Sequence, residues 1–142
     1  DIRGIIDSLD YIKSLPDAFA SYVTYVADRV TAGYPLSDYT IDEMVGYLDS
    51  VTEQEEDYYL IEVMQNMVDA CSYLSNEKKE QYKQNYEDYI NNYLMKAYGD
   101  LAEGIKAYKG NCEVEGYYSA YGDLGKKQYI YELNDLLISK PM

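Results

Sequence analysis

Apolar residues recur every three or four positions along most of the chain, the spacing of helices that bury one side. The first stripe predicts a helix over about residues 2–14, and a second predicts a helix over about 16–33. Proline is tolerated in the first turn of a helix, so Pro16 is expected to open the second helix. Gly33 is expected to end it, because glycine readily adopts the left-handed conformation of a C-cap. The two stripes comprise Ile2, Ile5, Ile6, Leu9 and Ile12, then Phe19, Tyr22, Val23, Val26 and Val30.

Two capping boxes predict the next two helix starts. In a capping box a hydroxyl and a carboxylate three residues later each satisfy a free amide at the open end of a helix. Thr40-Ile41-Asp42-Glu43 predicts a third helix, and Thr52-Glu53-Gln54-Glu55 predicts a fourth. The expected buried residues are Ile41, Met44, Val45, Leu48 and Val51, then Leu60, Val63, Met64, Met67, Val68, Cys71 and Leu74.

The longest stripe runs over residues 77–108 and predicts one helix of about 45 Å, at ~1.5 Å per residue. Gly110 is expected to end it. The helical pattern is lost over 111–124, where glycines and tyrosines alternate with polar residues, and returns over 126–138 with Tyr129, Leu133, Leu136 and Leu137. No alternating run predicts a strand. The expected fold is one all-α domain over 1–142, with about five to six mostly antiparallel helices around the long one and a Gly/Tyr-rich loop before the last.

Composition excludes several kinds of site. The 142 residues include no His and no Trp, but 20 Tyr against one Phe. Without imidazole, the chain cannot form a Ser-His-Asp triad, a Cys-His pair or a zinc site of mixed Cys/His type. Its two cysteines are too few for a four-cysteine zinc site. The composition therefore excludes imidazole-based catalysis and these zinc sites, and we expect no metal or cofactor in this segment.

The net charge of the chain disfavours two classes of binding partner. The formal net charge is −14, and a field of this sign repels nucleic-acid phosphates and anionic membrane surfaces. No apolar run is long enough to cross a bilayer. We expect neither a nucleic-acid partner nor membrane insertion.

Tyrosines and acidic residues each allow a functional and a structural interpretation. The tyrosines of the long stripe alternate with Leu and Ile, which favours core packing with the hydroxyls reaching water. Those of the Gly-rich loop, Tyr117, Tyr118 and Tyr121, could face a ligand. The acidic cluster over 53–57 is explained by the dipole at a helix start. Cys71 and Cys112 could form a disulfide or remain two thiols.

Four segments carry a family resemblance. Residues 7–16 form a short helix that leads to a Leu-Pro step, and residues 31–34 read Thr-Ala-Gly-Tyr. An Ala-Tyr pair precedes a Leu within 89–101, and Gly116-Tyr117 is followed by a Gly-Lys-x-x-Tyr sequence within 124–131. In this order they resemble the middle of the bacterial DUF885 family, large helical proteins whose full-length members look like zinc metallopeptidases. The resemblance covers essentially all 142 residues.

The resemblance implies a non-catalytic segment of a larger protein. The family's metal signature, His-Glu-x-x-x-Gly-His-His, lies farther toward the C-terminus and is absent here, and its adjacent Tyr pair stands here as Gln128-Tyr129. Zinc would therefore belong to the full-length protein, where a Glu would activate water. The implied partners are the remainder of the polypeptide and a peptide substrate. Tyr117, Tyr118, Tyr129 and Tyr131 are the candidate substrate-facing residues.

Two rival hypotheses remain open. The chain could be a freestanding extracellular binding module whose Tyr-rich loop takes a glycan or peptide, or a hydrolase that uses carboxylates alone. An exposed apolar patch would favour the scaffold segment over the binding module. The chain opens on Asp1 already in helical spacing, so we expect it to be cut from something longer. Because the family includes exported lipoproteins, an extracytoplasmic location, as a lipoprotein or a secreted protein, is the expectation.

Overall fold

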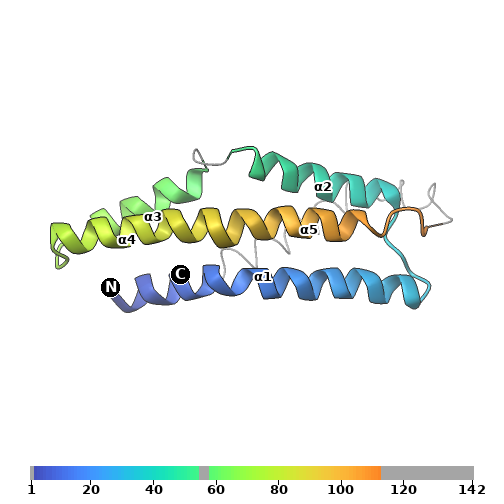
Figure 1. The fold of residues 1–142 in the computed structure, drawn as a ribbon, viewed down its shortest axis with the longest axis horizontal. Coiled ribbons are helices and arrows are strands. Elements are labelled where there is room, and N and C mark those ends of the chain that lie inside the picture. The colour runs from blue at the N-terminus through green and yellow to red at the C-terminus, as the bar shows by residue number, and fades with distance from the viewer. Residues whose placement is uncertain (1, 55–57, 113–142) are drawn as a thin grey trace.

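The computed structural model describes residues 2–54 and 58–112, and over these ranges it is helical with no strand. The helices are α1 (Ile2–Thr31), α2 (Asp38–Thr52), α3 (Tyr59–Asp69), α4 (Asn76–Tyr89) and α5 (Lys96–Lys106), with a π-helical segment, η2 (Ile90–Met95), between the last two. Figure 1 shows α4 and α5 in line, α1 along one side of them, and α2 and α3 along another. The predicted helix over 126–138 lies outside the described residues.

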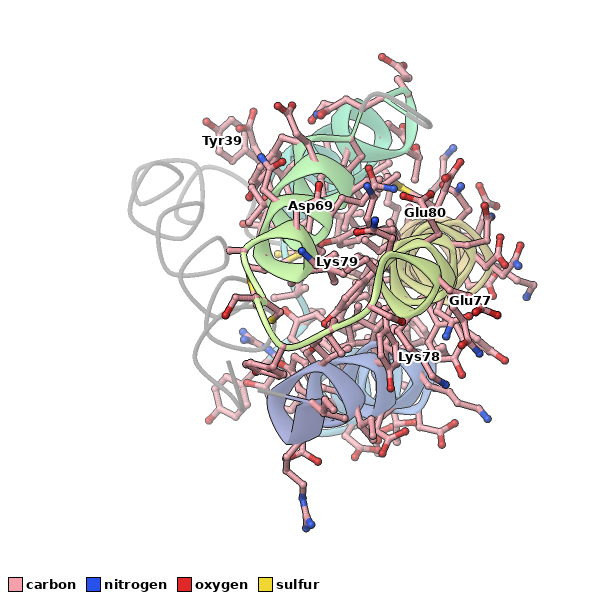
Figure 2. All side chains as sticks on the ribbon, turned by 90° about the vertical axis from the view of Figure 1, so that its left-hand side faces the viewer. Tyr39, Asp69, Glu77, Lys78, Lys79 and Glu80 are labelled. Carbon is pink, nitrogen blue, oxygen red and sulfur yellow. The ribbon has the colours of Figure 1, made fainter. Side chains whose placement is uncertain are left out.

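The directions of the helices differ in part from the expected antiparallel arrangement. The chain colours of Figure 1 show α1 and the α4–α5 line running the same way, with α2 and α3 running against them. Each of α1, α2 and α3 packs against this central line. Viewed from the end at which α4 begins, α1, α3 and α4 occupy three corners, with Glu77 on the outer side of α4 and Lys79 between α3 and α4 (Figure 2).

The prediction that Pro16 opens a second helix is wrong, because Pro16 lies inside the single helix α1. Proline removes one helical hydrogen bond and normally costs about 3 kcal/mol in a helix interior. The buried side of α1 continues unbroken across the proline, and burial of this continuous apolar side offsets that cost. Its buried apolar residues are Ile5, Leu9, Ile12, Leu15, Phe19 and Val26.

Gly33 ends α1 as predicted. Its φ is 85°, and the amides of Gly33 and Tyr34 donate to the carbonyls of Val30 and Arg29 at 3.1 and 2.9 Å. These are the two bonds of a Schellman motif, which satisfies the last carbonyls of a helix.

Neither predicted capping box marks the start of a helix. α2 begins at Asp38, and its cap is Ser37, whose hydroxyl accepts from the amide of Thr40 at 3.0 Å. Thr52 is the last residue of α2 instead of the cap of the next helix. α3 begins only at Tyr59, after Tyr58, which makes no side-chain cap bond.

The prediction of one unbroken α-helix over about 77–108 is not confirmed, because the π-helical segment divides it. Buried positions fall four apart from Tyr86 through Ile90 and Leu94 to Tyr98. At 100° per residue, each interval of four rotates the buried side by about 40°. The wider π turn takes up this drift and keeps all four side chains in the core.

Candidate functional site

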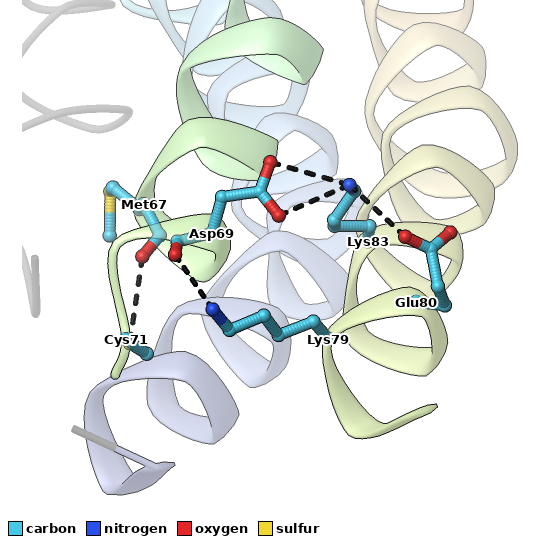
Figure 3. A network of polar contacts seen from close by, with 6 residues as sticks. All are labelled: Met67, Asp69, Cys71, Lys79, Glu80 and Lys83. Carbon is cyan, nitrogen blue, oxygen red and sulfur yellow. Dashed lines mark hydrogen bonds and ion pairs between the residues drawn. The ribbon is translucent and has the colours of Figure 1, made fainter. Parts of the chain in front are cut away.

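The four tyrosines predicted to face a substrate, Tyr117, Tyr118, Tyr129 and Tyr131, lie outside the described residues. Cys71 and Cys112 are free thiols. Cys71 lies in the turn after α3 and donates to the Met67 carbonyl at 3.5 Å (Figure 3). Cys112 follows α5, at the opposite end of the α4–α5 line (Figure 1). A disulfide needs Cα atoms within about 7 Å, so the structure does not bring this pair together.

The buried titratable groups that the structure does bring together are phenols. Tyr47 of α2, Tyr58 at the start of α3 and Tyr98 of α5 lie together, with Tyr59 beside them. Tyr98 is fully buried and Tyr58 is 5% exposed, whereas Tyr59 is exposed. The Tyr58 and Tyr59 rings meet edge to face with centroids 5.2 Å apart, and Phe19 of α1 packs on Tyr98 at 5.6 Å. We call Tyr47, Tyr58, Tyr59 and Tyr98 the tyrosine cluster. It lies where α2, the start of α3 and α5 meet, and Phe19 connects it to α1.

Burial keeps these phenols protonated. It raises the pKa of Tyr58 to about 12, against which the Tyr98 hydroxyl acts in the opposite direction. Burial likewise raises the pKa of Tyr98 and of Tyr47. A phenol serves as base or nucleophile only as phenolate, so a raised pKa disfavours both roles at neutral pH. The cluster is therefore suited to packing and hydrogen-bond donation.

A second polar group, shown in Figure 3, fixes α3 on α4. The Lys83 ammonium lies 3.2 and 3.3 Å from the two Asp69 carboxylate oxygens and 3.3 Å from Glu80. The Lys79 ammonium donates to the Asp69 carbonyl at 2.9 Å. A cation at the last carbonyls of a helix complements its dipole, so these contacts stabilise the C-terminal end of α3.

The acidic cluster over 53–57 is only partly described. Glu53 is the C-cap of α2, so its carboxylate does not stand in the first turn of a helix. Within residues 2–54 and 58–112, no three Cys, Asp or Glu side chains gather as a ligand set for a metal. In the same part of the chain, no helix is both long and apolar enough to cross a membrane.

An apolar cavity of about 250 Å³ opens between α1 and α5. It lies where the helices approach closely: a Cβ built on Gly104 would fall 2.7 Å from the Val23 Cγ2 atom. The sequence pattern gave no sign of this site, because Gly104 falls among residues of ordinary helical spacing. The lining residues are Pro16, Phe19, Ala20, Val23, Ala97, Asp100, Leu101 and Gly104.

Large apolar side chains also lie exposed on α1, nearer its N-terminus than the cavity. Ile2 and Ile6 are each 43% exposed. Ile2 and Ala20 are five helical turns apart at 3.6 residues per turn, so they lie on the same side of α1. We call Ile2, Ile6, Pro16, Ala20 and Val23 the outer strip; of these, Pro16, Ala20 and Val23 line the cavity, and the exposed Lys13 lies on the same side of α1 between Ile6 and Pro16.

No protein-family model, curated protein or solved structure matches this chain.

Proposed function

We propose that this chain is a non-catalytic helical scaffold segment of a larger peptidase-like protein, with the outer strip packed against another part of the same polypeptide. The observation that carries the proposal is the exposure of Ile2 and Ile6 on the same side of α1 as an apolar cavity that lies farther along the helix. Exposed large apolar side chains gathered on one side of a helix are typical of a surface that binds another protein segment.

The chemistry of the described residues agrees with a scaffold role. The best-defined group of titratable side chains is the tyrosine cluster, which is held neutral by burial. A neutral phenol can support packing or donate a hydrogen bond, but catalysis by the phenolate would need a lowered pKa.

The family part of the proposal is supported by the sequence resemblance to DUF885. On that basis zinc and its ligands belong to another region of the full-length protein. Tyr117, Tyr118, Tyr129 and Tyr131 are proposed to form part of the wall of a peptide-binding cleft, and an extracytoplasmic location is proposed on the same basis.

Two measurements test the proposal. Purified chain supplied with zinc and a fluorogenic peptide mixture is expected to show no hydrolysis above buffer; metal-dependent turnover would overturn a non-catalytic role.

The complete reading frame is expected to encode a further His-Glu-containing helix; a frame without further sequence would overturn the scaffold role and favour a freestanding binding module. For such a module, calorimetry with glycans or peptides would show affinity that Tyr117→Ala or Tyr118→Ala removes.

The outer strip is tested by amide hydrogen exchange in the longer polypeptide. The amides near Ile6 and Ala20 are expected to be better protected there than in residues 1–142 alone. Ile6→Asp should abolish the added protection, whereas Ser21→Asp, on the exposed side of α1, should leave it intact. Equal protection in the two proteins would show that nothing packs on the strip.

A further inference from the structure

The cavity between α1 and α5 opens on the side of the molecule away from α2 and α3. Tyr98 of α5 belongs to the tyrosine cluster, beside α2 and the start of α3. Asp100, which lines the cavity, follows Tyr98 by two residues and so lies about 200° around the helix. The residues that line the cavity all belong to α1 and α5. A group that enters it therefore meets these two helices alone among the described elements.

The cavity has an apolar inner wall and a more polar opening. Phe19 of α1 and Leu101 of α5 are each 2% exposed and form the inner wall. Ala20 and Asp100 are exposed and stand at the opening, one on each helix. A ligand would thus place an apolar group inside and a polar group at the mouth, the arrangement typical of binding sites that combine burial with orientation.

The size of the cavity suits one aromatic side chain. An apolar cavity of about 150 Å³ holds a benzene ring. The volume of about 250 Å³ has room for such a ring together with the methylene group that joins it to a backbone. The ring would lie against Phe19, and aromatic pairs gain free energy beyond the area that they bury. A smaller aliphatic side chain would leave part of the space empty and forgo dispersion contacts with its wall.

The charge at the opening favours a cation beside that ring. The Asp100 carboxylate lies 2.9 Å from the Lys96 ammonium, and the two side chains are 70% and 73% exposed. An ion pair this exposed contributes little free energy, so the Asp100 carboxylate can accept a second cation in its place. The formal net charge of −14 acts in the same direction, because it repels an acidic segment and attracts a basic one.

We propose that the polypeptide segment that packs on the outer strip inserts one aromatic side chain into the cavity and places a basic side chain beside Asp100. The inference rests on the proposed function and names the chemistry of the partner at the same surface. Aromatic side chains buried in a pocket carry most of the binding free energy in many interfaces. The cavity is therefore the anchor point of the outer strip.

Small aromatic ions test the cavity in residues 1–142. Benzylamine has an aromatic ring, a methylene group and, at neutral pH, an ammonium group; phenylacetate has the same ring and methylene with a carboxylate. Benzylamine should shift the methyl NMR signals of Val23 and Leu101 in a saturable manner, and phenylacetate should bind about tenfold more weakly or worse. Asp100→Asn should reduce this preference to less than about threefold. A lack of benzylamine binding, or equal binding of the two ions, would overturn the proposal.

A matched pair of leucine variants shows where benzylamine binds. Ala20→Leu should abolish the saturable shifts, because the larger side chain covers the opening of the cavity. Ser21→Leu, at the next residue and on the exposed side of α1, should leave the affinity within about twofold. Both positions are exposed, so neither substitution disturbs the core. Equal effects of the two variants would contradict binding in the cavity.

The longer polypeptide shows whether its own side chain fills the cavity. Benzylamine should bind to it at least about tenfold more weakly than to residues 1–142, because the aromatic side chain competes at high effective concentration. Unchanged benzylamine affinity together with added hydrogen-exchange protection near Ile6 and Ala20 would overturn this inference and leave the proposed function intact. Unchanged affinity without that protection would overturn both, since nothing would then pack on the outer strip.

Discussion

At the scale of single residues, the two fully buried tyrosines of the central line differ in how their hydroxyls are satisfied. Ser8 donates to the Ile5 carbonyl at 3.0 Å, which leaves the Tyr86 hydroxyl to donate to Ser8. The Tyr98 hydroxyl is buried beside Tyr58 and makes no hydrogen bond of normal geometry with a described residue. A buried polar group without a bond costs free energy, whereas a bonded one contributes modestly to stability.

The matched substitutions Tyr86→Phe and Tyr98→Phe should therefore have opposite effects. Tyr86→Phe is expected to lower the free energy of unfolding by about 1 kcal/mol, because it removes the bond to Ser8. Tyr98→Phe should leave the free energy of unfolding unchanged or raise it, because it removes a desolvated hydroxyl without changing the ring. Urea denaturation at neutral pH measures both, and a larger loss for Tyr98→Phe than for Tyr86→Phe would contradict this account.

At the scale of helices, the approach of α1 and α5 depends on a missing side chain. Val23 occupies the space that a Cβ on Gly104 would need, and a β-branched side chain in a helix has essentially one χ1 rotamer. Gly99 lies on the same helix, and a Cβ built there meets nothing within 4 Å. The two glycines thus differ only in whether their surroundings leave room.

Alanine at these two positions separates packing from helix propensity. Gly99→Ala is expected to stabilise the protein by about 0.5–1 kcal/mol, because it lowers the conformational entropy of the unfolded chain. Gly104→Ala should instead destabilise by roughly 1 kcal/mol or more, since overpacking outweighs the same entropic gain. Thermal unfolding of both variants measures the difference, and similar shifts in Tm would show that Val23 moves without cost.

The same scale shows what the sequence could and could not predict. The spacing of hydrophobic residues predicted the helical fold of the described residues. The preference of glycine for positive φ predicted the end of α1 at Gly33, because both signals are local. The prediction from local sequence failed at Pro16, because burial of the apolar side of α1 offsets the free-energy cost of a proline inside a helix. It failed again at Thr40, because Ser37 provides an equivalent cap three residues earlier. The tyrosine cluster could not be predicted, since it joins residues from three helices that only tertiary packing brings together.

At the scale of the whole molecule, a tyrosine-rich core lies inside a chain whose formal net charge is −14. In the described part of the chain, burial raises the pKa of Tyr47, Tyr58, Tyr86 and Tyr98. These buried phenols are therefore neutral in the folded protein. Their ionisation would add negative charge to a chain whose excess of carboxylates already causes charge repulsion.

Stability should accordingly be lost on the alkaline side. Below pH 10 the buried tyrosines are protonated in both the folded and the unfolded state, so their contribution is fully present. Above pH 10 the unfolded chain, with a tyrosine pKa of 10.0, releases protons before the folded state, in which the pKa of Tyr58 is about 12. The free energy of unfolding then falls as pH rises, and Tyr58 alone contributes about 2–3 kcal/mol of loss between pH 10 and 12.

Urea midpoints measured from pH 8 to 12 would reveal this fall, and phenolate absorbance would show whether the buried tyrosines ionise only as the protein unfolds. Tyr58→Phe provides the control, since removing its hydroxyl should flatten the decline above pH 10 without changing its direction. A midpoint that stayed constant to pH 12 in the unsubstituted protein would mean that these phenols ionise in place, with water reaching the interface of α2, α3 and α5. Alkaline stability therefore reports directly on how tightly the three layers close around the tyrosine cluster.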